Sequence, residues 1–335
     1  MEKIALDDVV ERLRAAGEVT RARVLVLLSR GELSVGELAQ ILGQSQPRLS
    51  RHMKYLTTAG LVERMPEGAW VFYRLTPDGP GRMLCDTILG LCDLEDPVIQ
   101  RDAARLEEVR TARRNEAQTF FENAAQEWDA IRALHYPEAD IEAAVIEAAG
   151  EGPFDRVVDI GTGTGRMLTL FSARADRVEG IDLSHQMLTV ARANLAAAGI
   201  TNAAIRHGDA TAAPLADGSA DLVLIHQVLH FLEEPARAIQ EAARILAPGG
   251  RLVAVDFAPH DLEYLRTEQS HRHLGVSETY FADWCRRAGL TLGPIKRFSE
   301  PEGGLAVNIW TADAPPTGTN KSAEATQASN RKVSV

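Results

Sequence analysis

The sequence predicts an α/β protein with two parts, an N-terminal winged helix-turn-helix domain and a C-terminal Rossmann-like domain with a seven-stranded sheet. Short amphipathic helices followed by two β-rich segments occupy the first quarter of the chain. A β-branched run then leads into three alternating glycines at residues 157–165. From that point strand and helix patterns alternate, which indicates a parallel sheet with ligand sites at the carboxyl ends of its strands.

Composition and charge narrow the class of protein. The chain has 335 residues, of which 45% are hydrophobic and 25% charged, enough for roughly two domains. No apolar run approaches the roughly 20 residues of a membrane helix, and the first residues lack the apolar core of a signal peptide. Three cysteines cannot pair evenly, so we expect a cytoplasmic protein with no membrane partner. Residues 1–76 carry 11 Lys and Arg against 9 Asp and Glu, whereas the remainder carries 25 against 38, which suggests that only the first part tolerates a polyanion.

The first helices are separated by glycine breaks. Apolar residues at helical spacing predict helices over 6–16 and 20–29. Ser34 is a good N-cap for a helix over 35–42, with Glu37 completing a capping box. Gly43 ends that helix, and a second helix follows at once, so the pair reads as a helix-turn-helix.

The second helix of that pair, 46–59, is predicted to start at the N-cap Ser45, with Pro47 in its first turn. It presents a row of amide, hydroxyl and basic side chains: Gln46, Arg48, Ser50, Arg51, His52 and Lys54. Such a row is most often a solvated face. Here it precedes two β-rich segments, 61–65 and 70–75, which are separated by Pro66-Glu67-Gly68-Ala69 and predict a hairpin. Helix-turn-helix plus hairpin is a winged helix.

Five runs in this region carry a resemblance. They are Ser34-Val35-Gly36-Glu37-Leu38-Ala39, Ser45-Gln46-Pro47-Arg48-Leu49-Ser50-Arg51-His52-Met53-Lys54-Tyr55-Leu56, Ala59-Gly60-Leu61-Val62, and Glu67-Gly68 with Tyr73-Arg74-Leu75. Together they are similar to the ArsR family of bacterial repressors. The resemblance implies a homodimer on double-stranded operator DNA, with recognition helices in major grooves roughly 34 Å apart. The implied DNA-binding residues are Gln46, Arg48, Ser50, Arg51, His52, Lys54 and Arg74. Of these, Lys54 and Arg74 would contact phosphates, and which of the others read bases stays open.

Many ArsR relatives sense metals through a Cys-x-Cys before the recognition helix, and this chain departs from that pattern. Residues 35–47 contain no Cys, His or Asp. Cys85 and Cys92 share a face of a predicted helix but lie roughly 10 Å apart along its axis. Each thiolate must be about 2.3 Å from a shared zinc ion, so this pair cannot chelate within one chain. We therefore predict no metal site and expect structural cysteines, leaving only a site shared across a dimer as an alternative.

The glycine-rich bend predicts a ligand site in the second half. The strand pattern 157–160 runs into Gly161, Gly163 and Gly165, and a helix begins near Arg166. Glycine permits the tight turn and lets a ligand approach the backbone. The next strand, 177–181, ends in Asp182, where an acid is expected to bind ribose hydroxyls.

Asp159-x-Gly-x-Gly-x-Gly165 resembles the first motif of class I S-adenosylmethionine (SAM) dependent methyltransferases. Its third glycine comes one residue too early for the phosphate-binding motif of nicotinamide enzymes. The resemblance implies SAM, or its product S-adenosylhomocysteine (SAH), as cofactor or effector. Asp159 would orient the ammonium group, Asp182 the ribose, and Asp209 the adenine amino group. The full set of implied cofactor-binding residues is Asp159, Gly161, Thr162, Gly163, Gly165, Asp182, Leu183, Met187, Asp209, Ala210 and His226.

The methyl acceptor should lie beyond the fourth strand, 220–226. Methyl transfer needs positioning and, for an O–H or N–H acceptor, a base. His226 or His230 could be that base, because histidine titrates near neutrality. The alternative places His226 against the cofactor and packs His230 in a helix. His271-x-His273 lies in a segment expected to be a solvated loop.

We place the domain boundaries at 1–95 (winged helix), 96–128 (helical linker or dimer seam), 129–313 (methyltransferase domain) and 314–335 (disordered tail). Trp128 or Tyr136 would line the cofactor pocket or belong to the core.

Two functions fit these motifs. The first is a repressor whose SAM- or SAH-binding domain controls DNA binding, which resembles regulators of methionine and SAM recycling. The second is an active methyltransferase on a small molecule, whose winged helix controls its own gene. Both leave the operator and the acceptor open.

Overall fold

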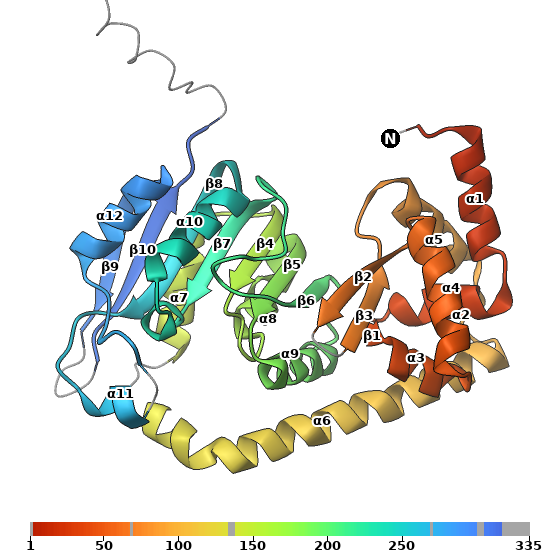
Figure 1. Cartoon of the computed structure of the whole chain (residues 1–335), viewed down its shortest axis with the longest axis horizontal. Coiled ribbons are helices and arrows are strands. Elements are labelled where there is room, and N and C mark those ends of the chain that lie inside the picture. The colour runs from red at the N-terminus through yellow and green to blue at the C-terminus, as the bar shows by residue number, and fades with distance from the viewer. Residues whose placement is uncertain (1–2, 68–69, 133–137, 269–270, 300–304, 317–335) are drawn as a thin grey trace, which may run out of the picture.

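The computed structural model describes residues 3–67, 70–132, 138–268, 271–299 and 305–316 and forms two lobes joined by one long helix (Figure 1). The first lobe contains, in chain order, α1 (Leu6–Ala16), α2 (Val19–Leu28), β1 (Leu33–Ser34), α3 (Val35–Leu42), α4 (Gln46–Thr58), β2 (Val62–Glu67), β3 (Trp70–Leu75) and α5 (Gly79–Leu91). The joining helix is α6 (Pro97–Arg132). Helix-turn-helix and hairpin are therefore both present.

Local signals in the sequence account for α3 and α4. Ser34 and Glu37 form the predicted capping box, and Gly43 ends α3 in the left-handed conformation at φ +64°. Ser45 occupies the N-cap of α4 as predicted, although among the described residues its side chain makes no capping hydrogen bond. Leu49 and Leu56 of α4 are fully buried, which turns the polar face of the helix outward.

The second lobe is an α/β domain. Its elements, in chain order, are α7 (Glu138–Ala149), β4 (Phe154–Ile160), α8 (Arg166–Phe171), η1 (Ser172–Arg174), β5 (Ala175–Asp182), α9 (His185–Ala197), β6 (Ala203–His207), β7 (Ala220–His226), η2 (Leu229–Phe231), α10 (Pro235–Ile245), β8 (Leu246–Phe257), α11 (Tyr264–Glu268), α12 (Glu278–Ala288), β9 (Thr291–Phe298) and β10 (Val307–Asp313). The seven strands lie in the order β6-β5-β4-β7-β8-β10-β9. Strands β4 to β8 are parallel, and β10 runs antiparallel to both of its neighbours.

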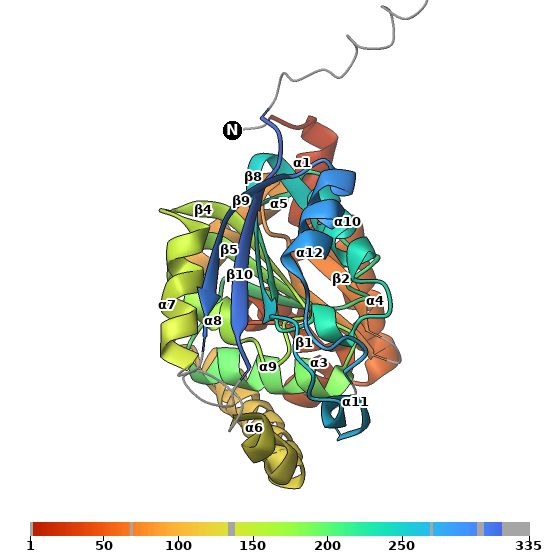
Figure 2. The same cartoon turned by 90° about the vertical axis from the view of Figure 1, so that its left-hand side faces the viewer.

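Helices cover both faces of this sheet (Figure 2). On one face α10 and α12 bury Ile239 and Phe281 against the strands. On the other face α7, α8 and α9 bury Val145, Leu168 and Leu188. The seven-stranded Rossmann-like architecture is confirmed, and its carboxyl-end edge carries the glycine bend and Asp182.

Helix α6 packs against the first lobe at its start. Leu106 and Val109 are buried in the core of that lobe. Arg23 of α2 makes two hydrogen bonds of 2.6 Å each to the carboxylate of Asp102. The helix continues four residues beyond 128, so the boundary proposed there falls inside one continuous helix.

Some elements were not anticipated. The strand β1 and the short helix α11 had no sequence signal, and Cys92 is the extended C-cap of α5 instead of a helical residue. All three cysteines are free thiols, and Cys85 and Cys285 are buried. Tyr136 and residues 317–335 lie outside the described residues, as does the side chain of Trp128. Within the described ranges, no helix is both long enough and apolar enough to cross a membrane.

Candidate functional site

Of the three glycines in the bend, two pack against neighbouring elements and one faces open space. A Cβ on Gly161 would lie 2.3 Å from Cγ2 of Val228, and one on Gly165 would lie 3.2 Å from Cβ of Ala191. These two glycines therefore let neighbouring elements pack closely. Gly163 differs, since no heavy atom of the described residues lies within 4 Å of the place where its Cβ would stand. The bend thus presents bare backbone to open space at Gly163, which is what a ligand lying across it requires.

Asp182 ties the bend to the next helix. Its Oδ2 accepts a hydrogen bond from the backbone N–H of Gly163 at 2.9 Å. Its Oδ1 accepts one from the backbone N–H of Ser184, the N-cap of α9, at 2.8 Å. A carboxylate has about four lone-pair positions, so each oxygen keeps capacity for a ligand hydroxyl. The sequence prediction that this acid lies beside the bend is consistent with these contacts.

Asp159 is a buried carboxyl group behind the same bend. It is 1% exposed, and burial raises the pKa of its carboxyl to about 7, with the Thr162 hydroxyl opposing and the Asp182 carboxylate assisting the rise. Within the described chain its Oδ1 has no hydrogen-bond partner. An unsatisfied buried acceptor is rare in folded proteins and marks a place for a missing donor. A cationic amino group would supply that donor and favour the ionised form.

The remaining predicted cofactor residues line the rim of this edge. Leu183 is 64% exposed and Met187 is half-buried, so both present apolar surface beside Asp182. Asp209 is exposed, with its Oδ1 accepting from the backbone N–H and the hydroxyl of Thr211 at 2.7 and 2.8 Å. Ala210 follows it, half-buried.

A histidine–aspartate pair occupies the expected acceptor side. His230 Nδ1 lies 2.7 Å from Oδ1 of Asp256, and the two residues are 2% and 0% exposed. An ionised carboxylate only accepts hydrogen bonds, so Nδ1 carries the proton and Nε2 keeps its lone pair. Asp256 lies near the end of β8, and the sequence motifs did not identify it as a site residue. His226 ends β7 half-buried, and the next residue, Gln227, has the left-handed φ of 60°.

Unsatisfied polar atoms surround this pair. Asn308 is fully buried beside Asp256 on the neighbouring strand, and in the part of the chain that is described neither atom of its amide has a partner. The same holds for Nε2 of His260 and Nε2 of His273. His271 is only 7% exposed and stacks on Phe257 with ring centroids 5.8 Å apart, so the expected solvated loop was wrong for this residue. No group of three or more His, Cys, Asp or Glu among the described residues is placed to hold a metal ion.

The predicted DNA-binding residues fall into two groups. The side chains on the outer face of α4 are exposed, and they are Gln46, Arg48, Ser50, Arg51 and Lys54. His52 is half-buried, with Nδ1 3.5 Å from a Glu18 carboxylate oxygen.

The predicted phosphate contact of Arg74 does not fit its position. Its guanidinium pairs with Glu63 at 2.8 Å and faces Glu179 of the second lobe at 3.7 Å, and the side chain is 13% exposed. Periodicity could not reveal this, because the partner lies more than a hundred residues away.

Known proteins match the two halves of the chain separately. The family model described as "Bacterial regulatory protein, arsR family" matches residues 18–64, and the model "Methyltransferase domain" matches residues 158–254. An arsenic resistance transcriptional regulator of Pseudomonas putida is 42% identical over 92 residues, which are 27% of this chain and 70% of that protein.

Two methyltransferases resemble the second lobe. An uncharacterized methyltransferase of Bacillus subtilis is 33% identical over 136 residues, 38% of this chain and 53% of that protein. A demethylmenaquinone methyltransferase of Thermus thermophilus is 33% identical over 144 residues, 42% of this chain and 65% of that protein. The chain therefore spans about half of the length of the first and less than two thirds of the second. Together with the exposed face of α4 and the bend beside Asp182, these matches show that the chain belongs to the arsR family of bacterial regulatory proteins and carries a methyltransferase domain behind its DNA-binding module.

Proposed function

We propose that this protein is a transcriptional repressor whose DNA binding responds to SAM or SAH held at the glycine bend of its methyltransferase domain. The observation that carries the proposal is the arrangement of Asp159, Gly163 and Asp182 in the same chain as an intact, exposed recognition helix. A sensor needs both a ligand site and a DNA-reading surface.

The groups at the bend fit an adenosyl amino acid. Asp182 has lone pairs for ribose hydroxyls, Gly163 offers bare backbone, and Leu183 offers an apolar face for a purine. The partnerless Oδ1 of Asp159 would accept from the ligand's ammonium group. SAM, when bound, supplies an activated methyl group on sulfur; SAH has the same recognition groups without it. The donor set alone therefore supports both compounds as effectors.

A homodimer is part of this proposal. Large apolar side chains stay exposed on α1 and on α5 with the turn after it, namely Leu6, Leu13, Met83, Leu91 and Leu94. Exposed apolar side chains of this size favour a protein interface. A second copy would cover them and bring a second α4 to an adjacent major groove.

The direct test is a titration of DNA binding. A duplex taken from the region preceding the protein's own coding sequence is expected to bind as two chains per duplex, and saturating SAH or SAM should change its Kd by about fivefold or more, the usual lower range of allosteric coupling. The variant Arg48→Ala/Arg51→Ala should lose duplex binding and keep ligand binding. An unchanged duplex Kd with both compounds would remove the sensor role.

Acidic pH should weaken ligand binding through Asp159. Its raised pKa of about 7 means that the carboxyl is mostly protonated at pH 6, while an ammonium ligand needs the carboxylate. SAH affinity should therefore rise about tenfold from pH 6 to pH 8, and binding at pH 6 should release close to one proton, measured by calorimetry in buffers of different ionisation enthalpy.

The variant Asp159→Asn shows whether the released proton comes from this carboxyl or from the ligand's own amine. If it comes from Asp159, the variant should bind SAH without releasing a proton. The stability of the free protein changes with pH in the opposite direction to its affinity for the ligand. A carboxyl whose folded pKa lies above its unfolded value makes the free protein less stable as pH rises from about 4 to about 7. The asparagine variant should therefore have the flatter stability curve over that interval.

The His230–Asp256 pair favours a second function, methyl transfer to a small molecule. A buried carboxylate that fixes the Nδ1 proton leaves Nε2 as a base. The unsatisfied atoms of Asn308, His260 and His273 offer polar contacts to an acceptor beside it. Relatives that are named as methyltransferases support the same reading. The two functions are compatible, since a sensor of SAH can also produce it.

A further inference from the structure

The hairpin of the winged helix rests on the free edge of the second lobe's sheet. Strand β2 lies beside β6, the outermost strand of the seven (Figure 1). The backbone N–H of Ile205 in β6 donates to Oε1 of Glu32 at 2.9 Å, and its carbonyl accepts from Arg192 at 3.4 Å. Side chains of the interface thus satisfy backbone groups that an edge strand would otherwise present to water.

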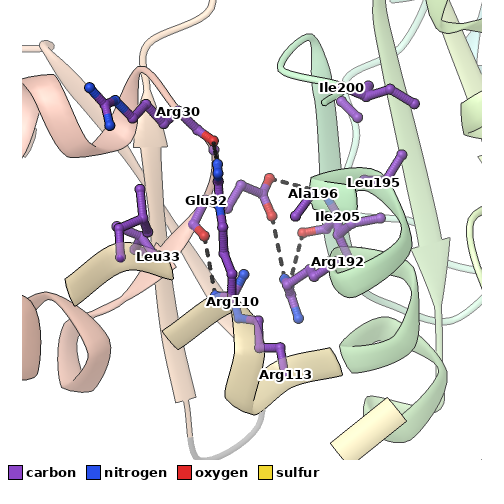
Figure 3. Close-up of a pocket in the computed structure, with 13 residues that line it drawn as sticks. Arg30, Glu32, Leu33, Arg110, Arg113, Arg192, Leu195, Ala196, Ile200 and Ile205 are labelled. Atoms are coloured by element: carbon purple, nitrogen blue, oxygen red, sulfur yellow. Dashed lines mark hydrogen bonds and ion pairs between the residues drawn. The ribbon is translucent and has the colours of Figure 1, made fainter. Parts of the chain in front are cut away.

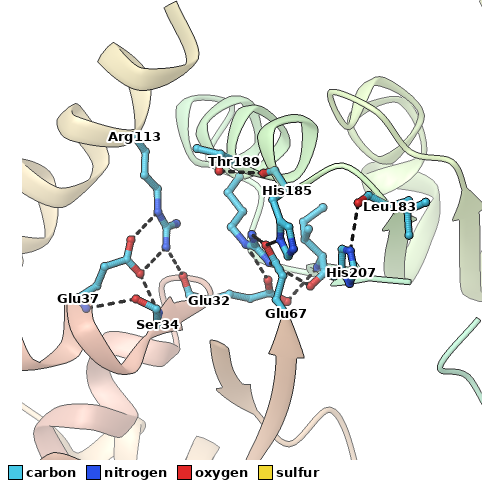
Figure 4. A network of polar contacts seen from close by, with 11 residues as sticks. Glu32, Ser34, Glu37, Glu67, Arg113, Leu183, His185, Thr189 and His207 are labelled. Carbon is cyan, nitrogen blue, oxygen red and sulfur yellow. Dashed lines mark hydrogen bonds and ion pairs between the residues drawn. The ribbon is translucent and has the colours of Figure 1, made fainter. Parts of the chain in front are cut away.

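Arg192 of α9 is the centre of this contact. Both of its terminal nitrogens pair with the carboxylate of Glu67 at the end of β2, one of them at 3.0 Å, and its Nε lies 3.5 Å from Glu32 (Figure 3). Figure 4 shows Glu67 beside His185 of the same helix. The guanidinium also lies 3.6 Å from the ring centroid of Phe72. All three charged side chains are at most 6% exposed. These partners of Arg192 come from the winged helix, so its burial depends on the lobes being together.

A second charged cluster buries Arg74, one of the predicted DNA-binding residues. Glu179 of β5 pairs with Arg156 and Arg206 of its own lobe and lies 3.7 Å from Arg74 of the hairpin. Burial raises the pKa of Glu179, but the surrounding guanidiniums outweigh it and the net shift is downward. Arg74 is thereby held by carboxylates and is not available to DNA phosphates in this arrangement.

The interface is polar and incompletely packed. Figure 3 shows a pocket between the lobes, lined by Arg30, Arg110, Arg113 and Arg192 together with aliphatic side chains. Buried ion pairs contribute little net stability, because both partners are well solvated when separated. A polar interface of this kind between domains of one chain can open at modest cost.

The hairpin contact begins next to the ligand site. Asp182 holds the N–H of Ser184, and Ser184 caps α9 through Met187. The first residue of α9, His185, places Nδ1 3.3 Å from Glu67 and stacks on His207 at 4.2 Å. Arg192 follows seven residues later, about 10 Å along the helix and on the same face. The ligand's anchor, Asp182, therefore holds the N-cap of the same helix that carries both anchors of the hairpin.

We propose that these contacts form a ligand-controlled latch, defined by His185 and Arg192 on α9 and Glu32 and Glu67 on the winged helix. The latch rests on the proposed function. A ligand on Asp182 stabilises the start of α9 and hence the closed latch, which sequesters Arg74 and holds the acidic second lobe against the hairpin. Closing therefore disfavours DNA binding. By linkage, DNA weakens ligand binding by the same factor.

The test opens the latch from the side that does not face DNA. Arg192→Glu places a carboxylate among Glu32 and Glu67, and it should separate the lobes while leaving the winged helix unchanged. Duplex affinity is measured by fluorescence anisotropy with and without SAH, using the duplex described above, and SAH affinity by calorimetry. In the unmodified protein SAH should weaken duplex binding about tenfold; in Arg192→Glu the duplex should bind as tightly with SAH as without it.

Two further variants make the result specific. The swap Glu67→Arg/Arg192→Glu should restore part of the SAH response, although it adds a positive charge to the hairpin that by itself would favour DNA. Arg177→Glu breaks another pair between the lobes, the exposed 2.8 Å contact with Asp78, and should leave the response intact. If Arg192→Glu does not fold, Glu67→Gln is used instead, because it weakens the latch without introducing a charge.

The outcomes separate the latch from the proposed function. If neither SAH nor SAM binds the unmodified protein, the proposed function is wrong, whereas tighter duplex binding by Arg192→Glu would still support docking as an inhibitory contact. If SAH binds and alters DNA affinity equally in the unmodified protein and in Arg192→Glu, the latch is overturned.

Discussion

Gly163→Ala is expected to leave the protein folded and to weaken SAH binding by about a hundredfold. The added methyl group meets no described atom within 4 Å, so it enters the space in front of the bend. There it would hold a ligand away from the backbone. A ligand held away from the bend loses about two hydrogen bonds to this edge of the sheet. At about 1 to 1.5 kcal/mol each, their loss corresponds to about a hundredfold in Kd. Calorimetry with SAH measures this loss.

Backbone strain needs its own control, because Gly163 has φ +52°. An alanine in the left-handed region costs about 1 to 2 kcal/mol, or a few degrees in Tm. Gly218→Ala, at φ +60° with no described atom within 4 Å, imposes the same strain in the turn before β7, at the opposite edge of the sheet. It should lower Tm similarly and leave SAH affinity unchanged. Full SAH affinity in Gly163→Ala would mean that the ligand does not cross this bend.

The glycines of the motif have different structural roles, as Gly161 shows. Its Cβ would collide with Val228 at 2.3 Å, so Gly161→Ala is a packing defect, and its loss of ligand binding would be uninformative. The sequence spacing identified all three glycines of the bend but could not assign these roles. The role of Gly161 depends on Val228, which follows the carboxyl end of β7, and the role of Gly165 depends on Ala191 of α9.

Local signals predicted most of the fold. The capping box at Ser34, the buried stripe of α4 and the strand that ends in Asp182 are each specified by neighbours in sequence. Alternating strands and helices then fix the parallel sheet, because crossover handedness leaves few other arrangements. The short elements β1 and α11 lacked such a signal.

Contacts between distant segments could not be predicted. Arg74 has the composition of a DNA contact, yet Glu179 from the other lobe captures it. Nothing near Asp256 in the sequence indicates its partner, His230, which η2 brings against it. In both cases a charged side chain is specified by a partner that only tertiary structure supplies. A polar residue within an apolar strand, such as Asp256 or Asn308, is the sequence signal that indicates such a position, because polar side chains are rarely buried without a partner.

Asp256→Asn should reduce methyl transfer by about a hundredfold or more while leaving SAH affinity unchanged, in keeping with the usual contribution of a general base. The carboxylate fixes the proton on Nδ1 of His230, and the backbone N–H of Phe257 holds the same oxygen at 2.8 Å. An amide of equal size can instead offer its NH2 group to Nδ1. The imidazole then carries its proton on Nε2, and the base is lost. Turnover is measured as SAH released from SAM with the best acceptor from a panel of phenols, hydroquinones and amines.

A purely structural role for Asp256 predicts a different pattern. It would lower Tm and SAH affinity together and leave the shape of the pH–rate profile intact, whereas a positioning role lowers kcat at unchanged SAH affinity and changes the shape of that profile. Asp221→Asn is the matched control, because that carboxylate accepts from two backbone N–H groups at the opposite end of the sheet, at 2.8 and 2.9 Å. Its loss should cost stability without touching turnover. If the unmodified protein methylates no member of the panel, or if Asp256→Asn is as active as Asp221→Asn, the catalytic reading falls. The buried pair would then be a structural feature of a domain whose function is to bind SAH.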